Sequence, residues 1–332
     1  MTHREVFAFG DWHGNKPAAL SYLRAILDKH PDARLIHVGD FGFWETDILT
    51  NEYKKKLNNY YENGKQGEFP ELNHTEDLRG YIYKVNQLLE EYNQDLYVCL
   101  GNHENYWEID LTYGYHGFCV HSPIIYDSVE PGNTFDMHIK EGIYPNEMRL
   151  YCTGMDITDD EATYDEDGFI TSELFPRVKI IPRAHVWTWD DVTYASLGGA
   201  NSIDIAFRTR GKTWWEQEAI HPEETEWLID LCKDKNIDVF ITHDAPEEVS
   251  YILYGHGAKL PDDIRAWGNR SGKELQKATC SINPTLQVCG HHHMRKTFLM
   301  SNGTTVEILD RENTKIHENS MNITKRLAEL QE

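Results

Sequence analysis

The sequence predicts an α/β fold, because buried strands alternate with helices along the chain and the strands end at polar motifs. Five apolar runs have the length of strands: residues 6–9, 35–38, 96–100, 237–241 and 286–289. Since these runs are continuously apolar, we expect strands that are covered on both faces. Helix-like stretches lie between them, at residues 17–29, 78–91 and 222–234. This alternation is typical of α/β architecture.

Each of the five predicted strands runs directly into a short motif. In chain order the motifs are Gly10-Asp11-Trp12-His13-Gly14, Gly39-Asp40-Phe41-Gly42, Gly101-Asn102-His103-Glu104, Thr242-His243-Asp244 and Gly290-His291-His292-His293. Ligands of open α/β sheets bind beside the carboxyl ends of the strands, where all five motifs fall. We therefore expect one functional site at this edge.

The residue types in these motifs suit a metal ion. Alternation past a strand end lets Asp11 and His13 point the same way, so that a carboxylate and an imidazole can hold one cation. Asn102 offers a neutral carbonyl oxygen, and His103 is either a ligand or a proton donor. Taken singly, each motif also fits a capped turn or a surface histidine. All five together, in this order, favour a metal site.

The motifs resemble the signature of the calcineurin-like metallophosphoesterase superfamily: Asp-x-His, Gly-Asp, Gly-Asn-His-Asp/Glu, His and Gly-His-x-His, spread here over residues 10–293. The resemblance implies a two-sheet sandwich flanked by helices and a pair of divalent metal ions. One ion would be held by Asp11, His13, Asp40 and His293. The second would be held by Asp40, Asn102, His243 and His291, with Asp40 bridging. Oxygen and nitrogen ligands without thiolate fit Mn, Fe, Ni, Co, Zn or Ca.

The implied reaction is phosphoester hydrolysis. Two ions can clamp a phosphate and generate a hydroxide that attacks in line. His103 is not needed as a ligand, so it is free to stabilise charge or to protonate the leaving oxygen. Glu104 either orients His103 or is an acid behind the site. The expected catalytic residues are His103, Asp40 and Glu104.

Two features bear on the branch of the superfamily. The Ser/Thr protein phosphatases carry Asp-Arg-Gly after the second motif, whereas Asp40 is followed here by Phe41-Gly42-Phe43-Trp44, which argues against protein phosphatase activity. Residues 197–218 resemble bacterial and phage metallophosphoesterases of unassigned substrate. We therefore expect a cytoplasmic protein of a bacterium or of a phage-infected host.

A basic cluster gives candidate substrate contacts in an otherwise acidic chain. It contains Arg183, Arg208, Arg210 and Lys212. Arginine forks suit phosphate, so Arg183 and Arg208, together with Asn102, are the expected substrate-binding residues. Arg208 is also spaced to pair with Asp204 on one helical turn, which is the alternative. The nearby Trp214-Trp215 pair is more typical of a core than of a base-stacking platform, and His292 is expected to face away from the metals.

The composition argues against some classes of binding partner. The chain has 332 residues and a formal net charge of -23, from 55 acidic and 32 basic side chains, and no basic stripe stands out. This argues against binding extended nucleic acid. No apolar run reaches the ~18–20 residues of a membrane span, and the start lacks a signal-peptide pattern. The even cysteine count allows disulfides, but Cys99 and Cys289 lie in strand-like runs and favour free thiols.

We expect one domain over residues 1–310 and a charged C-terminal tail over residues 311–332, with a short helix near Lys325. Residues 41–77 and 105–176 interrupt the strand-helix rhythm, and we expect insertions on the active-site side, serving as lids or as peripheral packing.

The favoured function is hydrolysis of small phosphomonoesters or phosphodiesters, such as nucleotides or cyclic nucleotides. A nuclease and a non-enzymatic scaffold are the alternatives. The overall acidity argues against the nuclease, and the complete ligand set argues against the scaffold.

Overall fold

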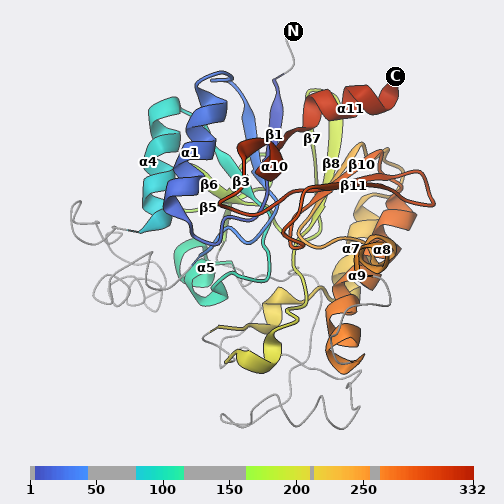
Figure 1. Cartoon of the computed structure of the whole chain (residues 1–332). Coiled ribbons are helices and arrows are strands. Elements are labelled where there is room, and N and C mark those ends of the chain that lie inside the picture. The colour runs from blue at the N-terminus through green and yellow to red at the C-terminus, as the bar shows by residue number, and fades with distance from the viewer. Residues whose placement is uncertain (1–3, 44–79, 116–161, 210–212, 255–261) are drawn as a thin grey trace.

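Two mixed β-sheets pack face to face, and helices cover their outer faces (Figure 1). The computed structural model describes residues 4–43, 80–115, 162–209, 213–254 and 262–332. The fold is the two-sheet sandwich flanked by helices that the sequence predicts.

The first sheet has the strand order β13-β1-β2-β3-β6-β5-β4. Its parallel strands are β1 (Val6–Phe9), β2 (Arg34–His37), β3 (Leu96–Val98) and β6 (Val178–Ile180). Antiparallel strands flank them: β13 (Ser320–Asn322), β5 (Ile170–Thr171) and β4 (Thr163–Tyr164).

The second sheet has the order β11-β12-β10-β9-β8-β7. Its parallel strands are β12 (Thr305–Ile308), β10 (Leu286–Cys289), β9 (Val239–Thr242) and β8 (Val192–Leu197). The antiparallel edges are β11 (Lys296–Leu299) and β7 (His185–Trp189).

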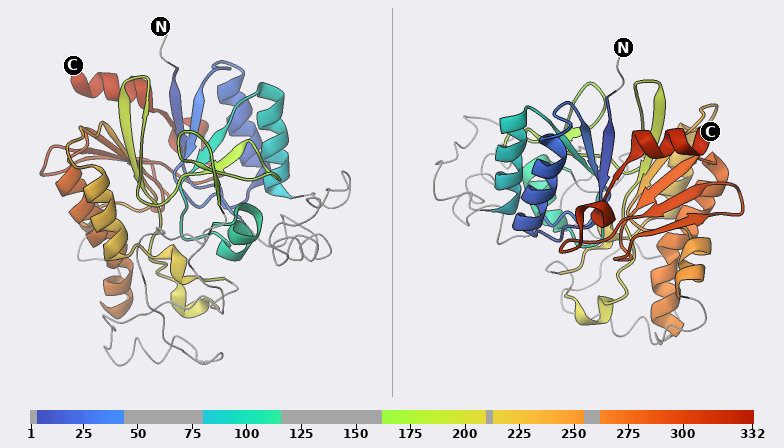
Figure 2. Two further views of the ribbon diagram at one scale, coloured as in Figure 1. Left: turned by 180° about the vertical axis from the view of Figure 1, so that it is seen from behind. Right: turned by 45° about the horizontal axis from the view of Figure 1, so that its top comes forward.

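Helices lie on both outer sides of the sandwich, as the two further views in Figure 2 also show. The first sheet is accompanied by α1 (Lys16–Leu27), α4 (Tyr81–Tyr92) and α5 (Tyr106–Tyr113). The second is accompanied by α7 (Pro222–Leu231), α8 (Glu247–Tyr254) and α9 (Asp262–Ile282). Two short 3₁₀ turns, η1 (Ile205–Phe207) and η2 (Glu216–Glu218), follow β8. The chain closes with α10 (Ile316–Asn319) and α11 (Ile323–Gln331).

The strand β1 shows why the predicted strands are apolar at most positions. Val6 and Ala8 belong to the core between the sheets, whereas Phe7 and Phe9 belong to the cluster that includes α1 and α4. Successive side chains of a strand point to opposite faces, so a strand buried on both faces needs apolar residues throughout. The five expected strands and three expected helices are all present, with ends displaced by a few residues.

The described parts of the second predicted insertion contain regular secondary structure. Residues 105–176 contain α5, β4 and β5, and the two strands extend the first sheet beyond β6. Tyr106, Ile109 and Tyr113 have helical spacing and are buried in the core, and neighbouring Gly and Asp residues obscured this short pattern. Residues 44–79 and 116–161, which make up most of both insertions, lie outside the described residues.

The C-terminal residues 311–332 are part of the sandwich rather than a separate tail. Strand β13 pairs antiparallel with β1, and α11 buries Ile323 and Leu327 against the core between the sheets. The surrounding charged residues hid these few apolar positions from the sequence analysis. The helix expected near Lys325 is present as α11.

Four of the six cysteines are described, and all four are free thiols: Cys99, Cys232, Cys280 and Cys289. This agrees with the expectation of free thiols for that part of the chain. Among the described helices, none combines the length and the apolar character that crossing a membrane requires.

A core substitution in the C-terminal segment tests whether it stabilises the domain. Ile323 is fully buried, so Ile323→Ala should lower the free energy of unfolding by about 2–5 kcal/mol, as large-to-small changes in a core do. Urea unfolding followed by circular dichroism measures the loss. Leu299→Ala, at a position that is 73% exposed, is the control. Equal, small effects of the two substitutions would mean that the segment adds no stability.

Candidate metal centre

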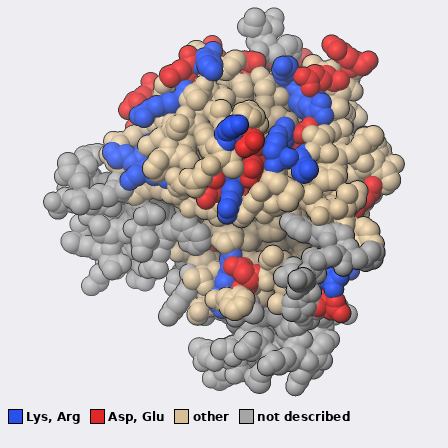
Figure 3. Space-filling view, viewed as in Figure 1, with Lys and Arg blue, Asp and Glu red and all other residues tan. Residues whose placement is uncertain are grey.

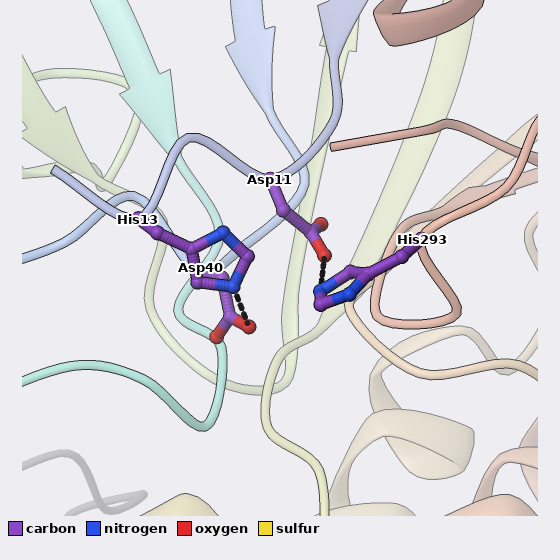
Figure 4. Close-up of side chains that lie close together, drawn as sticks. All are labelled: Asp11, His13, Asp40 and His293. Atoms are coloured by element: carbon purple, nitrogen blue, oxygen red, sulfur yellow. Dashed lines mark ion pairs between the residues drawn. The ribbon is translucent and has the colours of Figure 1, made fainter. Parts of the chain in front are cut away.

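The five predicted motifs converge where the carboxyl ends of β1, β2, β3, β9 and β10 meet. Two groups of side chains there place potential ligand atoms within 4.8 Å of one another. The first group, metal site 1, consists of Asp11, His13, Asp40 and His293 (Figure 4). The second, metal site 2, consists of Asp40, His243 and His291. Asn102 lies beside this group, because its Oδ1 is 3.0 Å from His243 Nε2. Every ligand expected from the sequence is therefore at this edge.

In metal site 1, carboxylate oxygens face imidazole nitrogens. His13 Nε2 lies 3.3 Å from Asp40 Oδ2, and His293 Nε2 lies 3.2 Å from Asp11 Oδ2. Both pairs appear as dashed lines in Figure 4. Asp11 and Asp40 are fully buried, whereas the His293 side chain is 36% exposed. This open side would let a substrate reach a bound cation.

Metal site 2 shares Asp40 with metal site 1. His243 Nε2 lies 3.2 Å from Asp40 Oδ1 and 3.0 Å from Asn102 Oδ1. The two oxygens of Asp40 thus face different histidines, Oδ2 toward His13 and Oδ1 toward His243. A carboxylate in this position can contact two cations at once.

Fixed hydrogen bonds orient the ligands of metal site 2. His243 Nδ1 lies 3.0 Å from the carbonyl oxygen of Val38, which can only accept, so Nδ1 carries the proton and Nε2 is free to bind. Asn102 Nδ2 donates to Ser202 Oγ at 2.9 Å, and Ser202 in turn donates to Glu218 at 2.6 Å. These two hydrogen bonds hold the Asn102 amide so that its carbonyl oxygen faces the metal site.

The ligand residues have unusual backbone conformations. His13, Asp40, His291 and His293 have φ values of 46°, 52°, 63° and 51°. Side-chain-bearing residues seldom adopt this left-handed region, and such residues cluster at functional sites. Close packing also requires glycine at position 290, because a Cβ there would lie 2.1 Å from Asp11 Oδ1. The left-handed backbone and the close packing at Gly290 therefore both help to position the ligand atoms.

The electrostatics of the site fit divalent cations. Burial lowers the pKa of His13, but hydrogen bonds to Asp40 and Glu312 outweigh it and raise the pKa to about 11. Burial likewise opposes protonation of His243, yet the charge of Asp40 raises its pKa to about 9. Two buried carboxylates thus create a strongly negative site. Hard oxygen and imidazole nitrogen donors around such charge suit divalent metals.

Glu104 has a different role from the predicted orientation of the His103 side chain. Its Oε1 accepts from the backbone N–H of Phe41 at 2.8 Å, and its Oε2 accepts from Gly42 and Phe43 at 2.9 and 3.0 Å. Burial, followed by the charge of Asp40, raises the pKa of Glu104 to about 7. Glu104 therefore fixes the loop after Asp40. Its motif position gave no sign of these backbone partners.

Arg183 does not face the metal centre as a free phosphate ligand. Its guanidinium is buried, pairs with Glu224 at 3.0 Å, and donates to the carbonyl oxygens of Gln217 and Ala219. These contacts make Arg183 a link between the end of β6 and the η2–α7 segment. Because its guanidinium is held by these protein partners, Arg183 is not placed to bind the phosphate of a substrate.

Arg208 lies beside the candidate metal centre. The sequence allowed either a pair with Asp204 or a contact with substrate, and the structure bears on both. Its Nε pairs with Asp204 at 2.8 Å, as the helical spacing indicates. Its Nη2 lies 2.6 Å from Nε2 of His103, while Nη1 donates to the carbonyl oxygen of Asn102 at 3.2 Å. Arg208 therefore joins the η1 turn to the third motif. Arg210 and Lys212 lie outside the described residues.

Other residues around the centre complete the comparison with the sequence. His292 pairs with Asp244 at 3.1 Å and is not a member of either ligand group. Trp214 and Trp215 are buried, as expected for core residues. Four polar residues outside the five strand-end motifs contact the ligands or their loops, and no role was predicted for them from the sequence. They are Ser202, Glu218, Glu312 and Asn319.

A two-sheet α/β sandwich that carries aspartates and histidines at the meeting strand ends defines a metallohydrolase. The calcineurin-like phosphoesterase model matches residues 5–295, and the chain belongs to this family. The protein is therefore a metal-dependent phosphoesterase, and divalent metals are the cofactors of this family.

Several solved structures are similar to this chain. Phosphopantetheinyl hydrolase from Mycobacterium tuberculosis is 13% identical, with 93% of this chain and 90% of that chain covered, at a TM-score of 0.43. The 5'-nucleotidase from Candida albicans is 12% identical, with 97% and 52% covered, at a TM-score of 0.36. Similarity at this level assigns no substrate. Among curated protein sequences, none matches the chain.

Substitution of the shared carboxylate tests the arrangement of the centre. Asp40→Asn removes one negative charge from both metal sites, so we expect weaker binding of both cations and a large loss of turnover. Inductively coupled plasma mass spectrometry of protein dialysed at fixed metal concentration measures the bound metal. Asp238→Asn, at an aspartate just before β9 and so at the opposite end of that strand from His243, is the control. Unchanged metal content in Asp40→Asn would reject the shared site.

Proposed function

We propose that this chain hydrolyses small phosphomonoesters or phosphodiesters, with nucleotides and cyclic nucleotides favoured, using two divalent ions. The observation that carries the proposal is the pair of ligand groups joined through Asp40. Bound there, the ions would activate water and neutralise charge on the phosphoryl oxygens. The metal remains one of Mn, Fe, Ni, Co, Zn or Ca, because the nitrogen and oxygen donors suit all of them to differing degrees.

His103 is the proposed acid and charge stabiliser. Its backbone N–H donates to Asp40 Oδ1 at 2.7 Å, and its ring lies 5.3 Å from that of His13, so it borders both metal sites. Burial, supported by the charge of Arg208, lowers the pKa of the His103 imidazole. A bound phosphoryl group adds negative charge, which favours the protonated form. The imidazolium can then give its proton to the leaving oxygen.

Arg208 and Asn102 are the proposed substrate contacts. The Arg208 guanidinium brings a permanent positive charge to His103, at the place where a phosphoryl group would bind. The amide of Asn102 is fixed by Ser202 and points its oxygen toward His243. Arg208 would act on the phosphate through its positive charge, and Asn102 would act through the cation that its oxygen faces. Their hydrogen bonds hold both side chains in place before substrate binds, which limits the entropic cost of binding.

The leaving group reveals whether His103 supplies a proton. His103→Ala should keep two bound ions but lose about 10²–10⁴-fold in kcat on an alkyl phosphoester, as removal of a general acid does. The loss should be smaller on a nitrophenyl ester, whose leaving oxygen needs no proton. Turnover of both esters and the metal content of the variant are to be measured together. The same loss on both esters would argue against proton donation.

The charge distribution supports small substrates. On the face that Figure 3 shows, Lys and Arg lie among Asp and Glu rather than in one stripe. Several described arginines pair with carboxylates: Arg34 with Asp190, Arg177 with Asp95, Arg183 with Glu224, and Arg326 with Glu307. A long nucleic acid binds through many phosphate contacts with free cationic side chains.

The described free thiols fit the reducing cytoplasm, which we propose as the compartment of this protein.

Substrate size separates the proposal from a nuclease. We expect a cyclic or bis-nitrophenyl phosphodiester to be cleaved far faster than duplex DNA, since the net charge of -23 repels a polyanion. The two turnover rates are compared at equal phosphate concentration and low salt, with heat-treated protein as the blank. Faster degradation of the duplex would replace our proposal with a nuclease.

A further inference from the structure

The C-terminal residues 310–319 bind directly to the loop that carries Asp11 and His13. The backbone N–H of Glu312 donates to the carbonyl oxygen of Asp11, and that of Gly10 donates to the carbonyl oxygen of Asn319, both at 2.7 Å. The family match ends at residue 295. A segment outside the matched residues therefore contacts the loop of metal site 1.

Within this segment, the side chain of Glu312 contacts a metal ligand. Its Oε2 lies 2.8 Å from Nδ1 of His13, while Nε2 of the same ring lies 3.3 Å from Asp40 Oδ2. The two side chains are mostly buried, at 15% and 19% exposure. Glu312 is thus behind His13, on the side of the ring opposite to the metal site.

We propose that Glu312 is a positioning residue of metal site 1, which holds His13 with its Nδ1 protonated and its Nε2 directed at the cation. This inference rests on the proposed two-metal site. An imidazole binds a metal only through an unprotonated nitrogen, and the partner of its other nitrogen decides which one that is. A carboxylate partner also makes the ligating nitrogen a stronger donor.

His243 provides an internal comparison for this arrangement. It also directs Nε2 at Asp40, but its Nδ1 donates to the neutral carbonyl oxygen of Val38. Glu312 gives His13 the same orientation and adds a negative charge behind the ring. Of these two imidazoles, the one in metal site 1 therefore has a carboxylate at its Nδ1, whereas His243 has a neutral acceptor there.

A purely structural role for the Glu312 side chain is less consistent with the contacts. The segment is anchored without it, because Asn319 accepts from Trp12 Nε1 at 3.0 Å and donates to the carbonyl oxygen of Asp310 at 2.7 Å. Glu312→Ala and Glu312→Gln both leave the backbone N–H that donates to the carbonyl oxygen of Asp11. Variants at position 312 should therefore fold normally.

The test is metal binding by the metal-free full chain, titrated with Mn²⁺ in a calorimeter. Glu312→Ala should weaken one of the two ions by about 10–100-fold, as loss of a partner behind a ligand typically does, and leave the other unchanged. Glu312→Gln keeps an oxygen that can accept from Nδ1 and should recover part of the affinity. Glu329→Ala is the matched control, since Glu329 lies in the following helix α11 and pairs with Arg326 instead.

Unchanged affinity for both ions in Glu312→Ala would overturn the inference. So would an equal loss at both sites accompanied by a lower melting temperature of the metal-free variant, because that result describes a structural residue. The readout is binding, so it is independent of the substrate. A wild-type protein that binds two ions and leaves every small ester intact would refute the proposed function alone.

Discussion

The Asp40 carboxylate is the interaction on which the rest of the centre depends. It is fully buried, and its two oxygens face His13 and His243, which come from opposite sheets. A buried charge is stable only when cations or hydrogen-bond donors surround it. The backbone N–H of His103 and the imidazoles meet part of this need, and divalent cations would meet the remainder. Asp40 thereby links the two sheets through one shared charge.

The backbone around Asp40 is held in a costly shape by its neighbours. Asp40 and His13 both have positive φ values, and such residues cost of order 1–3 kcal/mol each. The carbonyl oxygen of Asp40 accepts from the backbone N–H groups of Trp12 and His13, which ties the first two motifs together. Glu104 binds the next three N–H groups of the loop. These bonds make the ligand geometry rigid before any metal binds.

Residues outside the motifs orient the ligands inside them. Ser202 and Glu218 fix the amide of Asn102, Arg208 lies against His103, and Glu312 lies behind His13. They come from the segment after β8 and from the C-terminus, far from the ligands in sequence. Substitutions in these supporting segments offer a way to alter metal affinity without changing a ligand. Arg183 and Glu224, by contrast, form a buried ion pair that belongs to the framework.

The sequence alone determined the α/β class and the five strand ends with the polar motifs that meet there, because these depend on local apolar runs and on side-chain chemistry. It did not reveal the helix α5, the packing of residues 311–332, or the partners of Glu104 and Arg183. Those roles are set by contacts over long sequence separations, such as Glu312 with His13 and Arg183 with Glu224. A carboxylate or guanidinium has the same local pattern whether it binds substrate or braces a loop. Only the tertiary structure decided which, because packing selects the partner of each charge.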